Sequence, residues 1–230
     1  WLTREDLDAV SDSRPVMVLL GVHASILNTA AWKMTGYWEP GNESKVLWSD
    51  GSPRLGSHIY RDSAGHPTGI GTEIWDFRPH YTAEAYKRSI RRHFKDWFLA
   101  KGLTSMTTIP NDSPGQFQAL QELQREGAMP ARLRVYPIIP HSLPLSSVEI
   151  LGLQTGLGDG MLRFGGVKLF VDNGWDGMSG SRSDLKWTRE GLTDALTRCQ
   201  RAGLQVIMHV VTAEGMALTL DCIEAARQAA

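Results

Sequence analysis

Two patterns of apolar residues alternate through the second part of the chain. Short continuous apolar runs, typical of buried strands, are separated by segments in which apolar residues recur with the period of one helix face. The strand-like runs span residues 103–109, 131–139, 166–171 and 204–210. The helical segments span residues 82–102, 113–127, 145–156, 188–203 and 213–230. Strands that alternate with helices in this way predict βα units packed around a parallel sheet.

Residues at the ends of the helical segments agree with their assignment. Thr82 and Ser113 stand where an N-cap is expected, and Pro114 follows at a first helical position. Gly102 and Gly127 come where the helical patterns stop. The sequence therefore predicts both the existence of these two helices and their approximate bounds.

Residues 1–81 follow a different pattern, rich in turn formers and short β-like runs. We expect a strand over residues 14–23 and a helix over residues 24–36. The dipeptides that indicate hairpin turns are Asp50-Gly51 and Ala64-Gly65. We interpret residues 1–81 as an α+β insertion or subdomain, and residues 82–230 as the βα part of the chain.

The four βα units fit either a small doubly wound domain or half of an eight-stranded barrel. The sequence begins at Trp1 without a methionine and ends in "EAARQAA" within a helical pattern. These open ends favour part of a (β/α)8 TIM-type barrel, as an internal piece of a longer chain.

Composition excludes several classes of partner. The chain of 230 residues is 42% hydrophobic and 21% charged, with a formal net charge of −1, which is typical of a soluble globular protein. Neither nucleic acid nor an anionic membrane is an expected partner, and no apolar stretch is long enough to cross a bilayer. Cys199 and Cys222 lie in separate helical patterns and are expected to be reduced, which fits a cytoplasmic location.

Lys168 stands inside an apolar strand, "GVKLFV", where a charged ammonium is costly to bury. Strand alternation places Lys168 and Asp172 on one face, with Asp172 near the carboxyl end where parallel barrels carry their active sites. One interpretation is a snorkelling lysine or a buried Lys–Asp pair. The other is that the protein needs a lysine at this point for chemistry.

His209 lies near the end of "LQVIMHV", one βα step later, where its side chain could converge with that of Lys168. A structural histidine is the simpler interpretation, but imidazole is also the commonest metal ligand. A lysine that has lost its proton in an apolar pocket can react with carbon dioxide, and the carbamate is an anionic oxygen ligand. Desolvation lowers the lysine pKa, and a dication stabilises the product.

Several segments together resemble the amidohydrolase superfamily, and within it the group of N-substituted formamide deformylases and related metal-dependent hydrolases. The first two matches are "GVKLFVDNG" and "GLQVIMHV", in that order. The others are "RPVMVLLGVHASILNTAAW", "IYRDSAGHPTGIGTE", "AKGLTSMTTI" and "MPARLRVYPI".

This resemblance implies strands two to five of a (β/α)8 barrel that holds one or two divalent ions, usually zinc. Lys168 matches the carboxylated lysine that ends the fourth strand, and His209 the histidine that ends the fifth. His23 is then a contact at the rim of the pocket, and Asp172 lies where substrate is bound. The His-x-His of the first strand, the histidine of the sixth and the proton-shuttling aspartate of the eighth are expected outside this sequence.

Other activities are less well supported by the pattern. "TGLGDGMLRFGG" precedes a strand and does not link a strand to a helix, as a phosphate-binding loop would. No G-x-S-x-G elbow of a serine hydrolase is present. The tryptophans Trp1, Trp32, Trp38 and Trp48 could form a ligand platform, but scattered tryptophans are more often packing residues.

The function we expect is therefore hydrolysis of a C–N, amide-like bond in a small molecule by metal-activated water. The alternative is a catalytically silent or incomplete α/β domain that binds a small molecule, since catalytic zinc sites use at least three protein ligands. A homodimer is one expected assembly.

Overall fold

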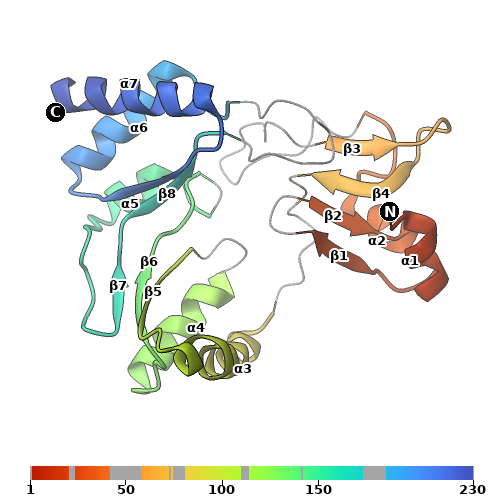
Figure 1. The fold of residues 1–230 in the computed structure, drawn as a ribbon, viewed down its shortest axis with the longest axis horizontal. Helices are drawn as coiled ribbons and strands as arrows, with labels where there is room; N and C mark the ends of the chain where they lie inside the picture. The colour runs from red at the N-terminus through yellow and green to blue at the C-terminus, as the bar shows by residue number, and fades with distance from the viewer. Residues whose placement is uncertain are drawn as a thin grey trace. The chain divides into compact units, whose positions relative to one another are not determined.

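The structure is a computed structural model, and it describes residues 2–20, 24–41, 58–72, 74, 81–109, 114–140, 142–172 and 185–229. The chain forms two compact units (Figure 1). The first comprises residues 1–78 and 172–186, and the second residues 79–171 and 187–230. The division at residue 81 stays a prediction.

The strands of the second unit are parallel, as the alternating pattern predicts. These strands are β5 (Ser105–Thr108), β6 (Arg132–Val135), β7 (Leu162–Phe164), β8 (Val167–Phe170) and β9 (Val206–His209). One sheet has the order β5-β6-β7, and β8 pairs with β9. Beyond the end of β6, a parallel bridge between Ile138 and Lys168 pairs the same segment of chain with β8. Mixed α/β structure with parallel sheets is thus confirmed, while the assignment to part of a (β/α)8 barrel stays a prediction.

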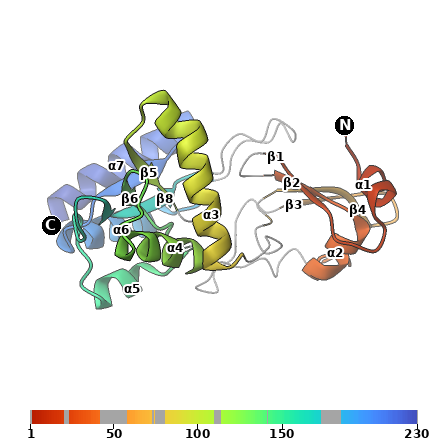
Figure 2. The ribbon, with the colours of Figure 1, turned by 90° about the horizontal axis from the view of Figure 1, so that it is seen from below.

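Helices accompany these strands (Figures 1 and 2). They are α3 (Ala83–His93), α4 (Pro114–Arg125), α5 (Leu145–Ile150), α6 (Arg189–Arg201) and α7 (Ala213–Ala229). Thr82 caps α3 by accepting a hydrogen bond from the N–H of Ala85, and Thr188 caps α6 in the same way from Gly191. After His93 the predicted helix continues as a π-helical turn (Phe94–Phe98) and a 3-10 turn (Leu99–Lys101), and it ends at Gly102 as predicted.

The segment between α5 and β8 differs from the sequence prediction. The helix predicted over residues 145–156 ends at Ile150, and residues 162–164 form β7. Gly165 and Gly166 separate β7 from β8, and both positions exclude a side chain. A Cβ on Gly165 would lie 2.2 Å from Cε2 of Tyr136, and one on Gly166 (φ 132°) would lie 1.9 Å from the carbonyl oxygen of Gln205. The two glycines therefore allow neighbouring strands to approach the chain closely.

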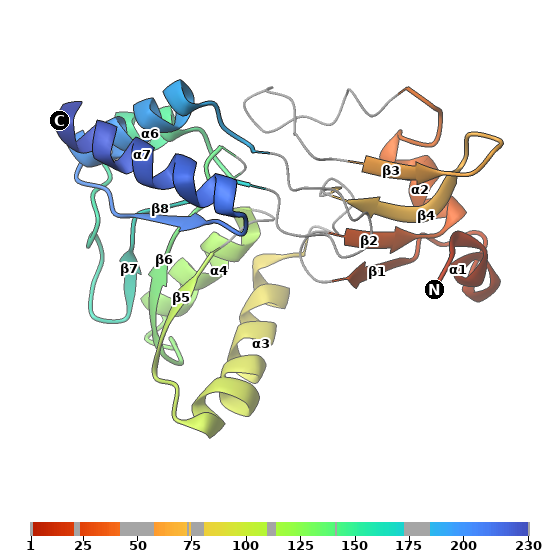
Figure 3. The same cartoon turned by 45° about the horizontal axis from the view of Figure 1, so that its top comes forward.

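The first unit contains an antiparallel sheet of order β1-β2-β4-β3 with two short helices (Figure 3). Its strands are β1 (Met17–Leu20), β2 (Ala24–Leu27), β3 (His58–Arg61) and β4 (Pro67–Thr72). Its helices are α1 (Arg4–Val10) and α2 (Thr29–Thr35). The predicted turn at Ala64-Gly65 is confirmed between β3 and β4, where Gly65 has φ 84°. The turn predicted at Asp50-Gly51 lies outside the described residues.

The predicted helix over residues 24–36 is wrong in its first part. Residues 24–27 form β2, which is buried throughout and pairs with β1 and β4. The helix begins only after Asn28, whose Oδ1 accepts hydrogen bonds from the N–H groups of Ala31 and Val16. Hydrogen bonding of β2 to strands on both of its sides therefore decides the structure of residues 24–27, although their apolar spacing also fits a helix.

Arg61 fixes the loop that follows α2. Its guanidinium donates hydrogen bonds to four backbone carbonyls, at distances of 2.8–3.1 Å. These carbonyls belong to Tyr37, Trp38, Glu39 and Gly65. A planar fork of donors suits such a cluster, whereas an ammonium group cannot reach all of it.

Arg61→Lys is therefore expected to lower the free energy of unfolding by about 2 kcal/mol, because several half-buried carbonyls lose their donors. Urea unfolding followed by circular dichroism measures this change. Arg14→Lys, at an exposed position of the same unit, is the matched control and should leave the midpoint unchanged. Equal midpoints for both variants would show that the guanidinium cluster does not stabilise the loop.

Candidate functional site

Lys168 is held in a strand that is paired on both sides. Its N–H donates to the carbonyl of Pro137 at 2.9 Å, and its own carbonyl accepts from the N–H of Ile139 at 2.9 Å. On the other side, Lys168 is the register partner of Ile207 in β9. Only 7% of the residue is exposed. The lysine is therefore enclosed by the sheet and its neighbours.

The strand register places Lys168 and His209 on one face of the β8–β9 pair. His209, the last residue of β9, is the register partner of Phe170. Partners in neighbouring parallel strands point to the same face, and so do residues two apart in one strand. Lys168 therefore shares its face with both Phe170 and His209.

The Phe170 ring contacts both candidate ligands. Nζ of Lys168 lies 4.8 Å from the centroid of this ring, and the His209 ring centroid lies 5.1 Å from it. Nε2 of His209 is screened from solvent. Sequence reasoning did not single out Phe170, although its spacing of two residues from Lys168 is the signal that could have found it. The ring makes this side of the site apolar.

Burial sets the electrostatics of Lys168. Desolvation lowers the pKa of its ammonium group below the usual 10.5. Among the described residues, the ion pairs do not include Lys168. Since no ion pair joins Lys168 to Asp172 among these residues, the alternative of a buried Lys168–Asp172 pair is not supported. The amine therefore loses its proton more readily than an exposed lysine.

This lowered pKa predicts a pH dependence of stability. Between the folded-state pKa and 10.5, the unfolded chain binds a proton that the folded chain does not, so stability rises with pH. The free energy of unfolding of the unsubstituted protein, relative to Lys168→Met, should therefore rise with pH between the folded-state pKa and about pH 10 in buffer with EDTA and without carbon dioxide. Urea titrations measure it, with Lys95→Met as the exposed control. Parallel pH curves for wild type and Lys168→Met would contradict the assignment.

Asp172 follows the end of β8 and is fully buried. The preceding residue, Val171, donates its N–H to the carbonyl of His209 at 3.0 Å, which aligns the ends of the two strands. Nε1 of Trp187 donates to the carbonyl of Phe170 at 2.9 Å. Asp172 itself forms a bridge with Leu185 and belongs to the first compact unit. Its predicted role with substrate remains a prediction, and His23 lies outside the described residues.

The donor set fits a metal ion in part. Residues 2–20, 24–41, 58–72, 74, 81–109, 114–140, 142–172 and 185–229 contain no group of three His, Cys, Asp or Glu side chains that could hold an ion. Lys168 is outside that set of residue types, and as a carbamate it would add oxygen donors beside the His209 imidazole. The described part of the chain therefore places the two candidate ligands, Lys168 and His209, on one face.

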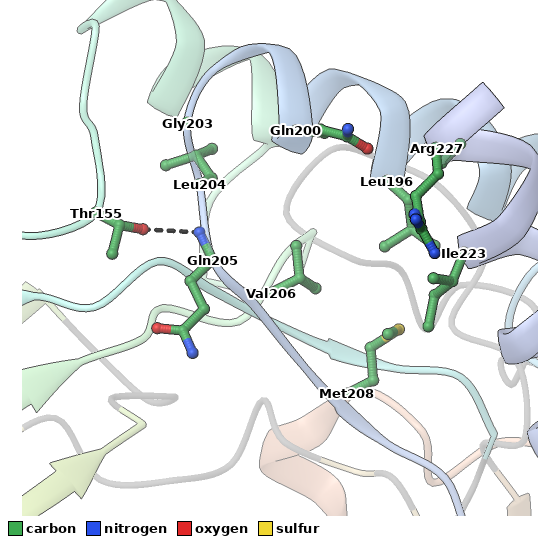
Figure 4. A pocket seen from close by; sticks show the side chains of 11 residues that line it. Thr155, Leu196, Gln200, Gly203, Leu204, Gln205, Val206, Met208, Ile223 and Arg227 are labelled. Carbon is green, nitrogen blue, oxygen red and sulfur yellow. Dashed lines mark hydrogen bonds between the residues drawn. The ribbon is translucent and has the colours of Figure 1, made fainter. Parts of the chain in front are cut away.

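A cavity of about 510 Å³ lies on the opposite face of β9 (Figure 4). Val206 and Met208 line it from the strand, side chains of α6 and α7 line it from the helices, and Thr155 with residues 203–205 completes the lining. At its edge, the N–H of Gln205 donates to Oγ1 of Thr155 at 2.7 Å. Because Val206 and Met208 alternate with Ile207 and His209, this cavity is separate from the Lys168 face.

No helix among the described residues combines the length and the apolar character that crossing a bilayer requires.

Comparisons with known proteins agree with the fold. Two similar solved structures are an uncharacterised metal-dependent hydrolase from Pyrococcus furiosus (TM-score 0.64, 22% identity) and another from Pyrococcus horikoshii OT3 (TM-score 0.66, 22% identity). The similarity covers 99% and 97% of this chain but only 46% and 44% of those two chains. None of the curated proteins compared matches the sequence. The profile of the amidohydrolase family matches residues 1–230, so this chain belongs to the amidohydrolase family.

Proposed function

We propose that this chain is part of a metal-dependent hydrolase that cleaves a C–N, amide-like bond in a small molecule. Family membership and the two solved metal-dependent hydrolases of similar fold support the hydrolase class. The observation that carries the proposal is the shared face of Lys168 and His209, where a buried lysine has no carboxylate partner among the described residues.

Lys168 contributes to the site as a carbamate. The lone pair of its neutral Nζ attacks the carbon of carbon dioxide, one C–O π bond becomes a C–O⁻ group, and the proton of the nitrogen leaves to solvent. The product carries one negative charge over two oxygens. Burial favours the neutral amine that this step needs, and a nearby dication favours the anion that it forms.

His209 supplies a neutral imidazole nitrogen on the same face. A divalent ion held by these two residues and by further ligands, for which we propose zinc, would lower the pKa of water and polarise a carbonyl oxygen. Phe170 covers one side of Lys168, and the burial of the lysine favours the neutral amine from which the carbamate forms. We propose that Asp172 and His23 contact the substrate, and that the aspartate that shuttles the proton lies outside this sequence.

Hydrolysis of an N-substituted formamide tests the function. We expect the purified, zinc-loaded full-length protein that contains this chain to release the amine from N-benzylformamide, and not to cleave a matched formate ester or phosphate ester at comparable rates. His209→Ala should reduce amine release by at least about 100-fold, because a metal ligand is lost. Lys95→Ala, an exposed lysine on the helix after α3, is the control.

Preferential cleavage of either ester would contradict the C–N bond class but not the hydrolase class. Zinc binding without hydrolysis of any of the three compounds would favour the alternative, a catalytically silent module that binds a small molecule. The cavity between β9, α6 and α7 is the observation that favours this second candidate, because it has the size of a small-molecule site.

A further inference from the structure

The ring of Phe170 is in contact with both candidate ligands. Phe170 lies two residues from Lys168 in β8 and is the register partner of His209 in β9. Its ring centroid lies 4.8 Å from Nζ of Lys168 and 5.1 Å from the centroid of the His209 ring. The positions of two side chains from two strands are therefore limited by one aromatic ring.

The backbone around Phe170 is held by hydrogen bonds to two other segments. The N–H of Val171 donates to the carbonyl of His209 at 3.0 Å, which joins the ends of β8 and β9. The carbonyl of Phe170 accepts a hydrogen bond from Nε1 of Trp187 at 2.9 Å. With the backbone held in this way, the ring moves only by rotation about its two side-chain torsions. Phe170 therefore presents a firm apolar surface to Lys168 and His209.

This surface restricts the direction in which a carbamate on Lys168 can extend. The carbon and oxygen of a carbamate reach about 2.2 Å beyond Nζ. A carbamate that pointed at the centre of the Phe170 ring would leave only about 2.6 Å between its oxygen and that centre. Atoms in van der Waals contact lie about 3.5 Å apart. The carbamate oxygens must therefore be directed away from the centre of the ring.

The same ring limits the orientation of the His209 imidazole. The planes of the two rings are inclined at 51°, and Nε2 of His209 is screened from solvent. Contact with Phe170 opposes rotation of the imidazole about its side-chain torsions. A ligand whose orientation is fixed in advance loses less conformational freedom when it binds a metal ion.

We propose that Phe170 is a positioning residue, whose ring holds the Lys168 carbamate and the His209 imidazole in the orientations that bind the metal ion. This inference rests on the proposed function, because it presupposes both ligands. The competing interpretation is that the ring holds Lys168 as an ammonium through a cation–π contact. The ring would then oppose formation of the carbamate, and its removal would strengthen metal binding.

Zinc affinity and the visible absorption of bound cobalt(II) test this role in the full-length protein that contains this chain, with bicarbonate present. We expect Phe170→Ala to weaken zinc binding by about tenfold or more, as the loss of a group that orients a ligand does. Its cobalt spectrum should differ from that of the wild type, because the spectrum depends on coordination geometry. Phe170→Leu keeps most of the apolar volume and should change both measurements in the same direction. Phe170→Tyr keeps the ring and should restore both.

Leu169→Val is the matched control, because residue 169 points to the opposite face of β8. This change shortens a fully buried side chain of the same strand. It should lower the thermal midpoint in EDTA and leave the cobalt spectrum unchanged. Zinc binding by Phe170→Ala and Phe170→Leu as tight as that of the wild type, or tighter, would overturn the inference. The same spectral change in Leu169→Val would also overturn it, since the effect would then come from the stability of the strand.

Two further variants separate this inference from the proposed function. Weaker zinc binding in Lys168→Ala and His209→Ala, but not in Phe170→Ala, would contradict the role of Phe170 and leave the proposed function intact. Unchanged zinc binding in all three variants would contradict the proposed function itself, and the role of Phe170 with it.

Discussion

Lys168→Ala is expected to lower the affinity for zinc by at least about 100-fold, more than the loss of an outer-shell partner usually costs. The variant lacks the amine that forms the carbamate, so His209 loses its proposed companion ligand. Elemental analysis after dialysis against zinc-free buffer measures this directly. Wild type should retain zinc in proportion to protein, and the variant should retain almost none.

Small carboxylic acids give a sharper version of this experiment. The truncated side chain leaves room for an acetate or propionate ion, whose carboxylate has the charge and the two oxygens of a carbamate. Zinc retention by Lys168→Ala should therefore recover in part when acetate is added, whereas wild type should not respond. Lys95→Ala controls for the loss of a lysine elsewhere. Zinc retention by Lys168→Ala equal to that of wild type would show that the lysine is not a ligand.

Gly166→Ala is expected to destabilise the protein by about 3 kcal/mol or more, or to prevent folding. The new Cβ would lie 1.9 Å from the carbonyl oxygen of Gln205, and a backbone atom cannot turn aside as a side chain does. The φ of 132° adds strain for any residue other than glycine. This strain would act at the residue before β8, within two residues of Lys168.

Two other glycines calibrate the effect of Gly166→Ala. Gly165→Ala should cost less, because its Cβ would meet the ring of Tyr136, which can move at the expense of its 2.8 Å hydrogen bond to Gln205. Gly160→Ala should be nearly neutral, since nothing lies within 4 Å of its added Cβ. Thermal unfolding of the three variants gives the order. A midpoint for Gly166→Ala equal to that of Gly160→Ala would refute the close strand approach.

The alternation of strands and helices in the second unit was predictable because its helices carry their own signals. Thr82 and Thr188 act as N-caps, and Gly102 ends the first helix as predicted. Residues 24–27 and 162–164 were not predicted as strands. Their pairing depends on neighbours distant in sequence, which local patterns do not encode.

The candidate site was predictable only at a residue whose type is unusual for its apolar environment. Lys168 could be found because a lysine is costly in an apolar strand, and alternation then indicated its face. The contact between Phe170 and His209 depends on the register between β8 and β9, which only the structure provides. His23 and the turn at Asp50-Gly51 remain sequence predictions.

The central claim is that Lys168 and His209 hold one metal ion between them. An anomalous difference map at the zinc absorption edge, from crystals of the protein grown with zinc and bicarbonate, tests this claim most directly. We predict a peak about 2 Å from an oxygen of a carbamate on Lys168 and about 2 Å from a ring nitrogen of His209. An unmodified Lys168, or a zinc peak bound to other residues with both of these side chains beyond about 5 Å, would contradict the account.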